Sequence, residues 1–475
     1  MMFKKYLKYK TKYLNYKKGG NIDSTENDIK ALILPHAGID YVKCIMDYVF
    51  YDNNDNNDNN DNNDNNENNE EKLKVKKEYT NIILLTTNHR SNNNVQFENQ
   101  LYGITKFDYN IMTFDDSFFG ETYDGKKEHS HLSILPYLEK FRCKKYIICI
   151  GKYDEGLIAK ILEMINKSKT LIIANTDLLH CGDNFKTKCP LNTKIYNKNM
   201  IEQIINNNIP DQICGKEAIH TFLKIVEKLG YKYVEYVQSS SNMIDKSSSN
   251  DVGYCGLIYN KSGNVLLNNG NYLSKIPRMI LNEKFDWDNN TIKSISKFRE
   301  RIPIELYLKD IIGIFVTVYL KIDDKLELKG CLGTYTLHND IFDTIIIQTI
   351  ESTFDDSRFT NDHITKENLN NCVFKINFLE KSVKYSGDKL IENVLKNLIV
   401  NTHGIIVDFK SSRATYLASV LSEHFGMNDS NKNEKIYDAI KSLRLKSGLA
   451  NNTNIDDVSD VVSIELYKCV EISEI

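Results

Sequence analysis

The chain has 475 residues, 41% of them hydrophobic and 26% charged, and its formal net charge is -3 at pH 7. This length exceeds what one hydrophobic core usually holds, so two domains are expected. The balanced charge does not indicate nucleic-acid binding, no apolar run is long enough to span a membrane, and the N-terminus lacks the apolar core of a signal peptide. We therefore expect a soluble, intracellular, cytoplasmic protein.

Ten cysteines are scattered along the chain without a CxxC pair or a regular spacing. This distribution argues against a disulfide framework and against a structural zinc ribbon. Each cysteine therefore has to be interpreted from its own surroundings.

The chain begins with a basic arm at 1–29, in which Lys and Tyr alternate with Phe and Leu. We interpret it as a solvated, loosely helical tail, with contact to a membrane surface or to nucleic acid as the alternative. A second polar segment at 52–71 consists mainly of Asn and Asp repeats. It has nothing to bury, so we expect a disordered insertion that takes no part in the chemistry.

Two short apolar runs flank this insertion, and a histidine follows each of them. ALIL leads to His36, and IILLTT leads to His89. Such runs are typical of strands covered on both faces of a sheet, and ligands of open α/β sheets bind at the carboxyl ends of the strands. The two imidazoles therefore suggest a metal or proton-transfer site, although each could also be an ordinary hydrogen-bonded loop residue.

The rest of the first half repeats the order of apolar strand, polar loop and amphipathic helix. This alternation predicts an α/β domain at 30–260 with a mostly parallel sheet flanked by helices. The expected strands lie at 144–151, 170–177, 231–237 and 252–259, and the expected helices at 155–169, 192–207 and 216–230.

Further polar side chains follow in this half. Asp177 and His180 come after the run LIIAN, and on a first helical turn the carboxylate could orient the imidazole or share a proton with it. Cys214 precedes Gly215 and a helix, where a lowered pKa makes it a candidate thiolate ligand or nucleophile. The segment EHSHLSILPY adds His129 and its neighbours. Together these positions are typical of a functional site.

The second half of the chain has a different pattern of hydrophobic and polar residues. We expect a linker at 261–290, a domain at 291–450 and a C-terminal segment at 451–475. Strands with more alternation and intervening helices predict an α+β fold with an antiparallel component. The expected strands lie at 313–322, 327–335, 371–380 and 404–410, and the expected helices at 341–354, 388–400 and 433–446.

Cys331 lies between Gly330 and Gly333 in LKGCLGTY, where glycine permits close backbone approach. It is a candidate catalytic nucleophile or contact residue, or equally a small cysteine packed in a tight turn. Arg358 and His403 follow at the ends of other elements.

The segments ILPHAG, LLTTNH, EHSHLSILPY, NTDLLHCGD, ICGKEAI and YVQSSS…DVGYCG resemble the Memo family in order and spacing. This resemblance implies the fold of the class III extradiol dioxygenases and a metal site formed by His36, His89 and Cys214, with Asp177 and His180 close by. Copper or iron is the implied ion. Two imidazoles and a thiolate also favour soft or borderline ions over magnesium or calcium.

The segments LKGCLG, DDSRF, NTHGIIV and ATYLASVLSEHFG resemble the AMMECR family, with Lys329 where that family has arginine. The activity of that family is not established, so the resemblance implies a fold and a candidate cleft. Members of the two families often occur with a radical-SAM protein, which is therefore a candidate partner. The opening KYLKYKTKYL also resembles leaders of giant DNA virus proteins.

These observations favour a metal-dependent oxidoreductase of unknown substrate, in which Asp177 and His180 move or orient a proton. The alternative is a non-catalytic adaptor that uses a vestigial metal pocket to bind a peptide or small molecule. A third idea, nucleotide or nucleic-acid binding near Cys331, has no basic face to support it.

Overall fold

The computed structural model describes residues 28–51, 75, 78–89, 95–96, 129–263, 272–286, 299, 303–323, 325–359, 364–449 and 459–473. All but the last two residues of the expected basic arm, and all of the expected Asn/Asp-rich insertion, lie outside these ranges. The chain forms two compact units, one of residues 1–266 and 302–309, the other of residues 267–301 and 310–475.

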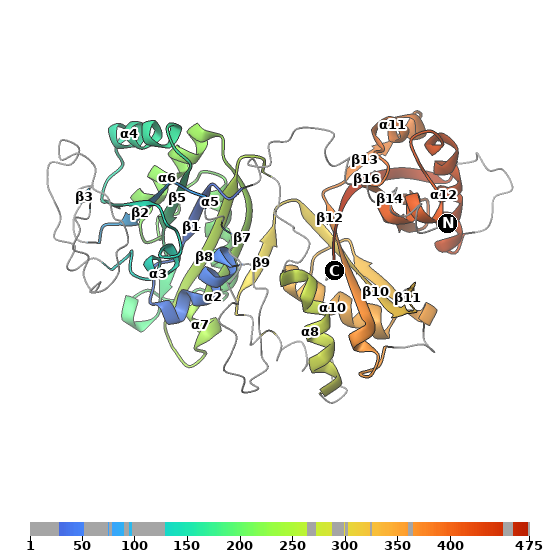
Figure 1. Ribbon diagram of the computed structural model, residues 1–475, viewed down its shortest axis with the longest axis horizontal. Helices are drawn as coiled ribbons and strands as arrows, with labels where there is room; N and C mark the ends of the chain where they lie inside the picture. The colour runs from blue at the N-terminus through green and yellow to red at the C-terminus, as the bar shows by residue number, and fades with distance from the viewer. Residues whose placement is uncertain are drawn as a thin grey trace. The chain divides into compact units, whose positions relative to one another are not determined.

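The first unit contains a nine-stranded sheet whose four central strands are parallel (Figure 1). The sheet order is β3-β4-β2-β5-β1-β8-β7-β9, and β6 pairs with β8. The strands are β1 (Ala31–Leu34), β2 (Asn81–Thr87), β3 (Val95–Gln96), β4 (Lys144–Ile150), β5 (Thr170–Asn175), β6 (His180–Cys181), β7 (Lys232–Ser240), β8 (Asp251–Asn260) and β9 (Glu305–Leu308).

Helices cover both faces of this sheet, which confirms the expected α/β layout. One face packs against α4 (Glu155–Asn166), α5 (Thr193–Ile205) and α6 (Lys216–Leu229). On the other face α2 (Ile39–Phe50) places Ile45 and Val49 against Gly256. Short helices α3 (Leu135–Leu138) and α7 (Ser241–Ile244) complete the unit. Every residue of β1, β2 and β5 is buried, because these strands are covered on both sides.

The second unit is built on an antiparallel sheet with the order β11-β10-β12-β16-β14-β15, to which β13 is added beside β16. The strands are β10 (Ile311–Ile322), β11 (Lys325–Thr334), β12 (Cys372–Glu380), β13 (Val383–Ser386), β14 (His403–Phe409), β15 (Arg413–Tyr416) and β16 (Val461–Ser473). The helices α8 (Tyr272–Asp286), α10 (Ile341–Phe354), α11 (Leu390–Asn397) and α12 (Lys432–Lys446) accompany it, so the expected α+β fold is also confirmed.

Three segments differ from the sequence-based expectation. The expected linker at 261–290 contains α8, which packs against α10 and β12 (Figure 1). Strand β9 pairs with β7 in the first sheet, and the expected C-terminal segment supplies β16, which lies between β12 and β14. These roles depend on non-local strand pairing, which a local hydrophobic pattern does not encode.

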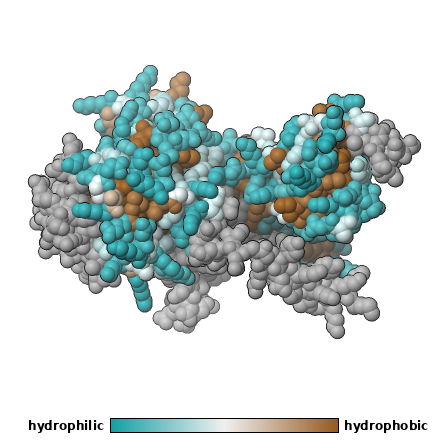
Figure 2. Space-filling model, turned by 90° about the horizontal axis from the view of Figure 1, so that it is seen from above, coloured by the Kyte–Doolittle hydropathy of each residue, from teal (hydrophilic) through white to brown (hydrophobic). Residues whose placement is uncertain are grey.

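Hydrophobic side chains on the surface are distributed over both units. Figure 2 shows brown areas among hydrophilic teal ones on each of them. Among the described residues, no helix combines the length and the apolar character needed to cross a bilayer.

His403 makes the stability of the second unit pH-dependent. Burial and the neighbouring Lys468 lower the pKa of His403, and its Nδ1 accepts a hydrogen bond from the Ile399 amide at 3.1 Å. The unfolded chain takes up this proton at a pH of about 6.5. Stability should therefore fall as the pH drops below that value, until the pH reaches the lower pKa of the folded state.

We expect the melting temperature to drop more between pH 7.5 and pH 5.5 in the parent protein than in His403→Gln, because glutamine can accept the same bond without becoming charged. Circular dichroism melting curves of both proteins test this. An equal drop in the two proteins would contradict a role for His403.

Candidate metal centre

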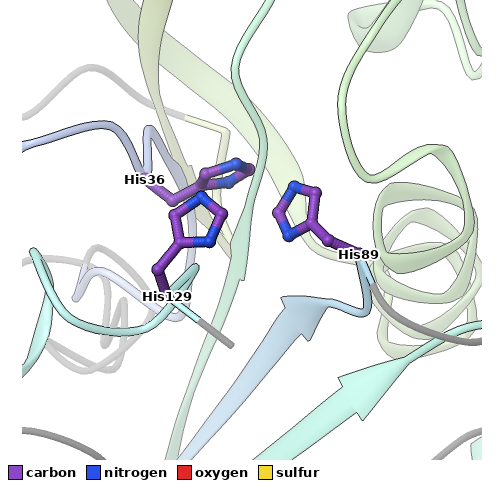
Figure 3. Close-up of side chains that lie close together, drawn as sticks. All are labelled: His36, His89 and His129. Atoms are coloured by element: carbon purple, nitrogen blue, oxygen red, sulfur yellow. The ribbon is translucent and has the colours of Figure 1, made fainter. Parts of the chain in front are cut away.

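Three parallel strands deliver polar side chains to one edge of the first sheet. His36 lies two residues after β1, His89 two residues after β2 and Asp177 two residues after β5. The carboxyl ends of parallel strands meet at the same edge, so these side chains converge there. The ring centroids of His36 and His89 are 5.2 Å apart, with the two ring planes nearly perpendicular. Figure 3 shows both rings side by side beyond the strand ends.

Cys214 reaches this edge from the segment that precedes α6. Its amide donates to the Asp177 carbonyl at 3.0 Å, and the Thr176 hydroxyl donates to the Cys214 carbonyl. Gly215 follows with a φ of 84°, and a Cβ atom there would lie 2.1 Å from Thr87 Oγ1. Glycine is therefore required next to Cys214, both by the left-handed backbone and by the close approach of β2.

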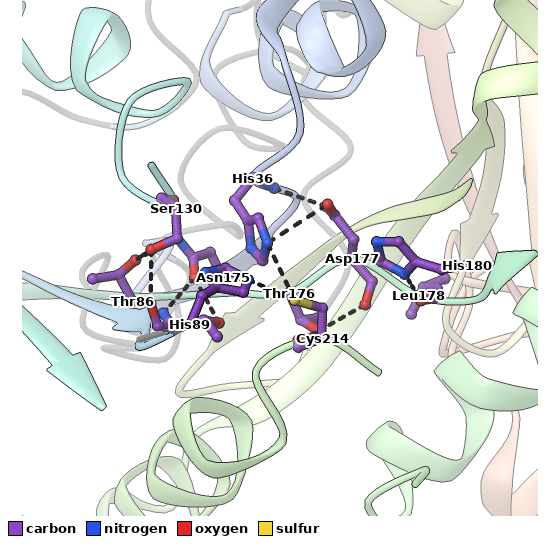
Figure 4. A network of polar contacts seen from close by, with 11 residues as sticks. His36, Thr86, His89, Ser130, Asn175, Thr176, Asp177, Leu178, His180 and Cys214 are labelled. Atoms are coloured by element: carbon purple, nitrogen blue, oxygen red, sulfur yellow. Dashed lines mark hydrogen bonds and ion pairs between the residues drawn. The ribbon is translucent and has the colours of Figure 1, made fainter. Parts of the chain in front are cut away.

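The three predicted ligands are brought together. Cys214 Sγ lies 2.9 Å from His89 Nε2 and 3.4 Å from His36 Nε2 (Figure 4). Adjacent nitrogen and sulfur ligands of a tetrahedral ion lie about 3.5 Å apart, given ordinary metal–ligand distances. The Nδ1 atom of His36 is also buried, without a hydrogen-bond partner among the described residues. The donor set therefore suits a transition metal, and of the two distances the one to His36 matches this spacing while the one to His89 is shorter.

A third imidazole, that of His129, joins this cluster. It stacks on His89 with ring centroids 4.7 Å apart, and His36, His89 and His129 each offer a nitrogen within 4.8 Å of the others (Figure 3). Sequence reasoning named the segment of His129 but left it out of the ligand set. The sequence offered no signal that separates His129 from His131, because the burial of Ser130 and His131 appears only in the structure.

Ser130 fixes the position of His129. Its hydroxyl donates to the Thr87 carbonyl at 2.9 Å and bonds to the Thr86 hydroxyl, while the Asn175 amide group donates to the Ser130 carbonyl. These contacts join the segment of His129 to the ends of β2 and β5 (Figure 4). The third imidazole is thus held by buried polar contacts between elements far apart in sequence.

His36 is held in the form that binds metals. Burial lowers its pKa, and the neighbouring His89, His129 and His180 act in the same direction, whereas Asp177 opposes them. The Asp177 carboxylate accepts from the His36 amide at 2.9 Å and lies 3.6 Å from His36 Nε2. The resulting neutral imidazole is a competent ligand. Asp177 holds its backbone through the amide and lies on the same side of the ring as Cys214, next to Nε2.

The expected pairing of Asp177 with His180 is wrong. The backbone after Asp177 does not form a helical turn but continues to β6, so side chains three residues apart do not share a face. Asp177 contacts His36 instead, while His180 Nδ1 lies 3.0 Å from the Leu178 carbonyl and its ring packs on Phe185. His180 therefore lies beside the cluster and not within it.

In the second unit Cys331 is part of a separate polar group. Its amide donates to Asp356 at 2.9 Å, and Arg358 donates to its carbonyl at 2.8 Å as well as to Asp356. Burial raises the pKa of the Cys331 thiol, which disfavours the reactive thiolate. His403 lies on β14 and its ring nitrogen is bound to the Ile399 amide, so it does not share these contacts.

One pair of cysteines forms a disulfide, although the cysteine spacing indicated no disulfide framework. Cys181 and Cys189 form a disulfide with their Cα atoms 4.9 Å apart. Their spacing matches no motif, and they meet because the chain turns back on itself after β6. The other eight cysteines are not in disulfides.

Comparisons with known proteins find a family match in each half of the chain. The Memo-like protein family matches residues 70–258, and the AMMECR1 family matches residues 280–472. A curated protein of Caldivirga maquilingensis is 26% identical over 145 residues, which are 30% of this chain and 61% of the relative, so the chain spans less than two thirds of it. The crystal structure of an uncharacterized protein from Pyrococcus horikoshii matches 42% of this chain and 88% of its own, with 18% identity and a TM-score of 0.31. The two family matches confirm the resemblances to the Memo and AMMECR families over these residues, which do not include the ILPHAG segment of His36.

Proposed function

Because the chain joins a Memo-like domain at residues 70–258 to an AMMECR1 domain at residues 280–472, we propose that its first unit is a metal-dependent redox domain that binds copper or iron. The observation that carries this proposal is the convergence of His36, His89 and Cys214 from three separate segments, with Cys214 Sγ within 3.4 Å of both imidazoles. A thiolate with two imidazoles suits copper and iron better than magnesium or calcium.

The three histidines of the site differ in their exposure to solvent. His36 is buried at the base of the site, whereas His89 and His129 are exposed. A substrate would therefore approach from the side of His89 and His129. Bound copper or iron would supply one-electron redox chemistry at this position.

In this proposal Asp177 orients a ligand and His180 transfers a proton. Asp177 orients His36 through the contacts described above. A carbonyl oxygen only accepts hydrogen bonds, so His180 Nδ1 carries its hydrogen toward the Leu178 carbonyl, and Nε2 is the atom that takes up or releases a proton.

Metal analysis by mass spectrometry tests the proposal directly. The full chain, purified without a metal affinity step, should contain about one equivalent of copper or iron. The triple variant His36→Ala, His89→Ala, Cys214→Ser should contain none. Circular dichroism of the variant serves as the folding control.

If the parent protein is empty and takes up neither Fe(II) nor Cu(I), the redox proposal fails. A non-catalytic binding role for the same pocket would then be the function to pursue.

A further inference from the structure

The disulfide closes an exposed loop that begins directly after His180, the residue beside the histidine cluster. Cys181 is completely buried on β6, Cys189 is half-buried, and residues 183–188 between them are exposed. The two cysteines are therefore unequal, since Cys181 is not exposed at all, whereas Cys189 is partly exposed although its side chain also packs against the core of the first unit.

We propose that the Cys181–Cys189 pair is a thiol–disulfide exchange site whose substrate is a dithiol reductant. A thiolate of the reductant attacks Cys189 Sγ, which breaks the bond between the two protein sulfurs and releases Cys181 as the leaving thiolate. The second thiol of the reductant then displaces Cys189. Two electrons and two protons pass to the protein, which gains two thiols, while the reductant becomes a disulfide.

The surroundings of Cys189 favour attack at that sulfur. Lys186 and Lys188 are exposed on the same loop, and they place positive charge near an incoming thiolate. Cys181 is shielded by the pairing of β6 with β8, in which it lies opposite Asp251. Exchange thus begins at one defined sulfur.

The loop keeps its shape through contacts that do not involve the disulfide. Gly182 N donates to the Thr187 carbonyl at 2.7 Å, Asn184 N donates to Asn250 Oδ1 at 2.8 Å, and Ser249 donates to Asp183. These contacts hold the ends of the loop together after reduction. Because the sequence separation of the cysteines is only 8, the thiols stay close enough to form the bond again.

The redox state of the pair would be transmitted to His180. This residue directly precedes Cys181, and its ring contacts Phe185 within the closed loop at a centroid distance of 5.0 Å. Any effect on metal chemistry rests on the proposed function, whereas the exchange reaction itself does not.

Counting alkylated cysteines by mass spectrometry tests the proposal. The folded chain is treated with oxidised or with reduced dithiothreitol, the reagent is removed, and the protein is denatured and alkylated. With ten cysteines in the chain, we expect eight alkylated after oxidation and ten after reduction, in repeated cycles. In Cys189→Ser the count should be nine in both states, whereas the matched control Cys44→Ser should give seven and nine.

Two results would overturn the proposal. Ten alkylated cysteines after oxidation would mean that no disulfide forms, and eight after treatment of the folded chain with reduced dithiothreitol would mean a disulfide closed to exchange. Metal content is measured in the same samples. Protein without metal but with the expected counts would refute only the metal proposal, and metal-bound protein with ten thiols after oxidation would refute only the exchange site.

Discussion

Replacement of Cys214 by serine is expected to lower the affinity for Cu(I) by at least about a hundredfold, the upper end of what the loss of a second-shell partner costs. The thiolate is the one soft ligand of the cluster, and its sulfur lies 2.9 Å and 3.4 Å from the two imidazoles. A serine hydroxyl in the same place is a poor ligand for a soft ion. Competition with a chelator of known affinity measures the change.

Comparing His129→Ala with Cys214→Ser distinguishes two candidate ligand sets. One is His36, His89 and Cys214, and the other is the three histidines. If copper uses His36, His89 and Cys214, removing His129 should cost about tenfold at most, because His129 would act through its stacking on His89. A larger loss for His129→Ala than for Cys214→Ser would show that the three histidines form the ligand set and would contradict the thiolate site.

Replacement of Gly330 by alanine is expected to destabilise the second unit by about 3 kcal/mol, at the upper end of what overpacking costs. A Cβ atom at this position would lie 1.8 Å from the Ser352 carbonyl oxygen and 2.8 Å from its carbonyl carbon, which belong to the backbone of α10. The helix would have to move away from β11. Urea unfolding of the full chain, followed by circular dichroism, measures the loss.

Gly387→Ala is the matched control, because it tests strain without crowding. Gly387 has a φ of 89°, and a Cβ atom there would have no heavy atom within 4 Å. This substitution should lower the free energy of unfolding by about 1–2 kcal/mol, the cost of placing a residue with a side chain in the left-handed conformation. If Gly330→Ala proves no more destabilising than Gly387→Ala, the close packing of α10 on the LKGCLG segment is not what that glycine provides.

The two predictions concern Cys214 and Gly330, and the sequence already indicated that both positions matter. The motif around Cys331 indicated that a backbone comes close, and the structure identifies it as the end of α10 at Ser352. For Cys331 itself the expected catalytic role stays a prediction. The structure shows a buried thiol with a raised pKa beside the Asp356–Arg358 pair.

The sequence by itself predicted the central parallel strands and where the candidate site lies on the sheet. Continuous apolar runs specified β1, β2 and β5, and the histidines that follow the first two had to meet, because parallel strands end at a common edge. The family resemblances added Cys214 to this pair. These inferences hold because they rest on local periodicity and on one rule of sheet geometry.

Only the tertiary structure decided which distant groups touch. It placed His129 on His89, turned Asp177 toward His36 instead of His180, and joined Cys181 to Cys189. It also moved residues 305–308 into the first sheet as β9. Each of these contacts depends on loop paths and on the pairing of segments far apart in the chain, and a pattern of hydrophobic and polar residues records which face a side chain takes but not which partner it meets.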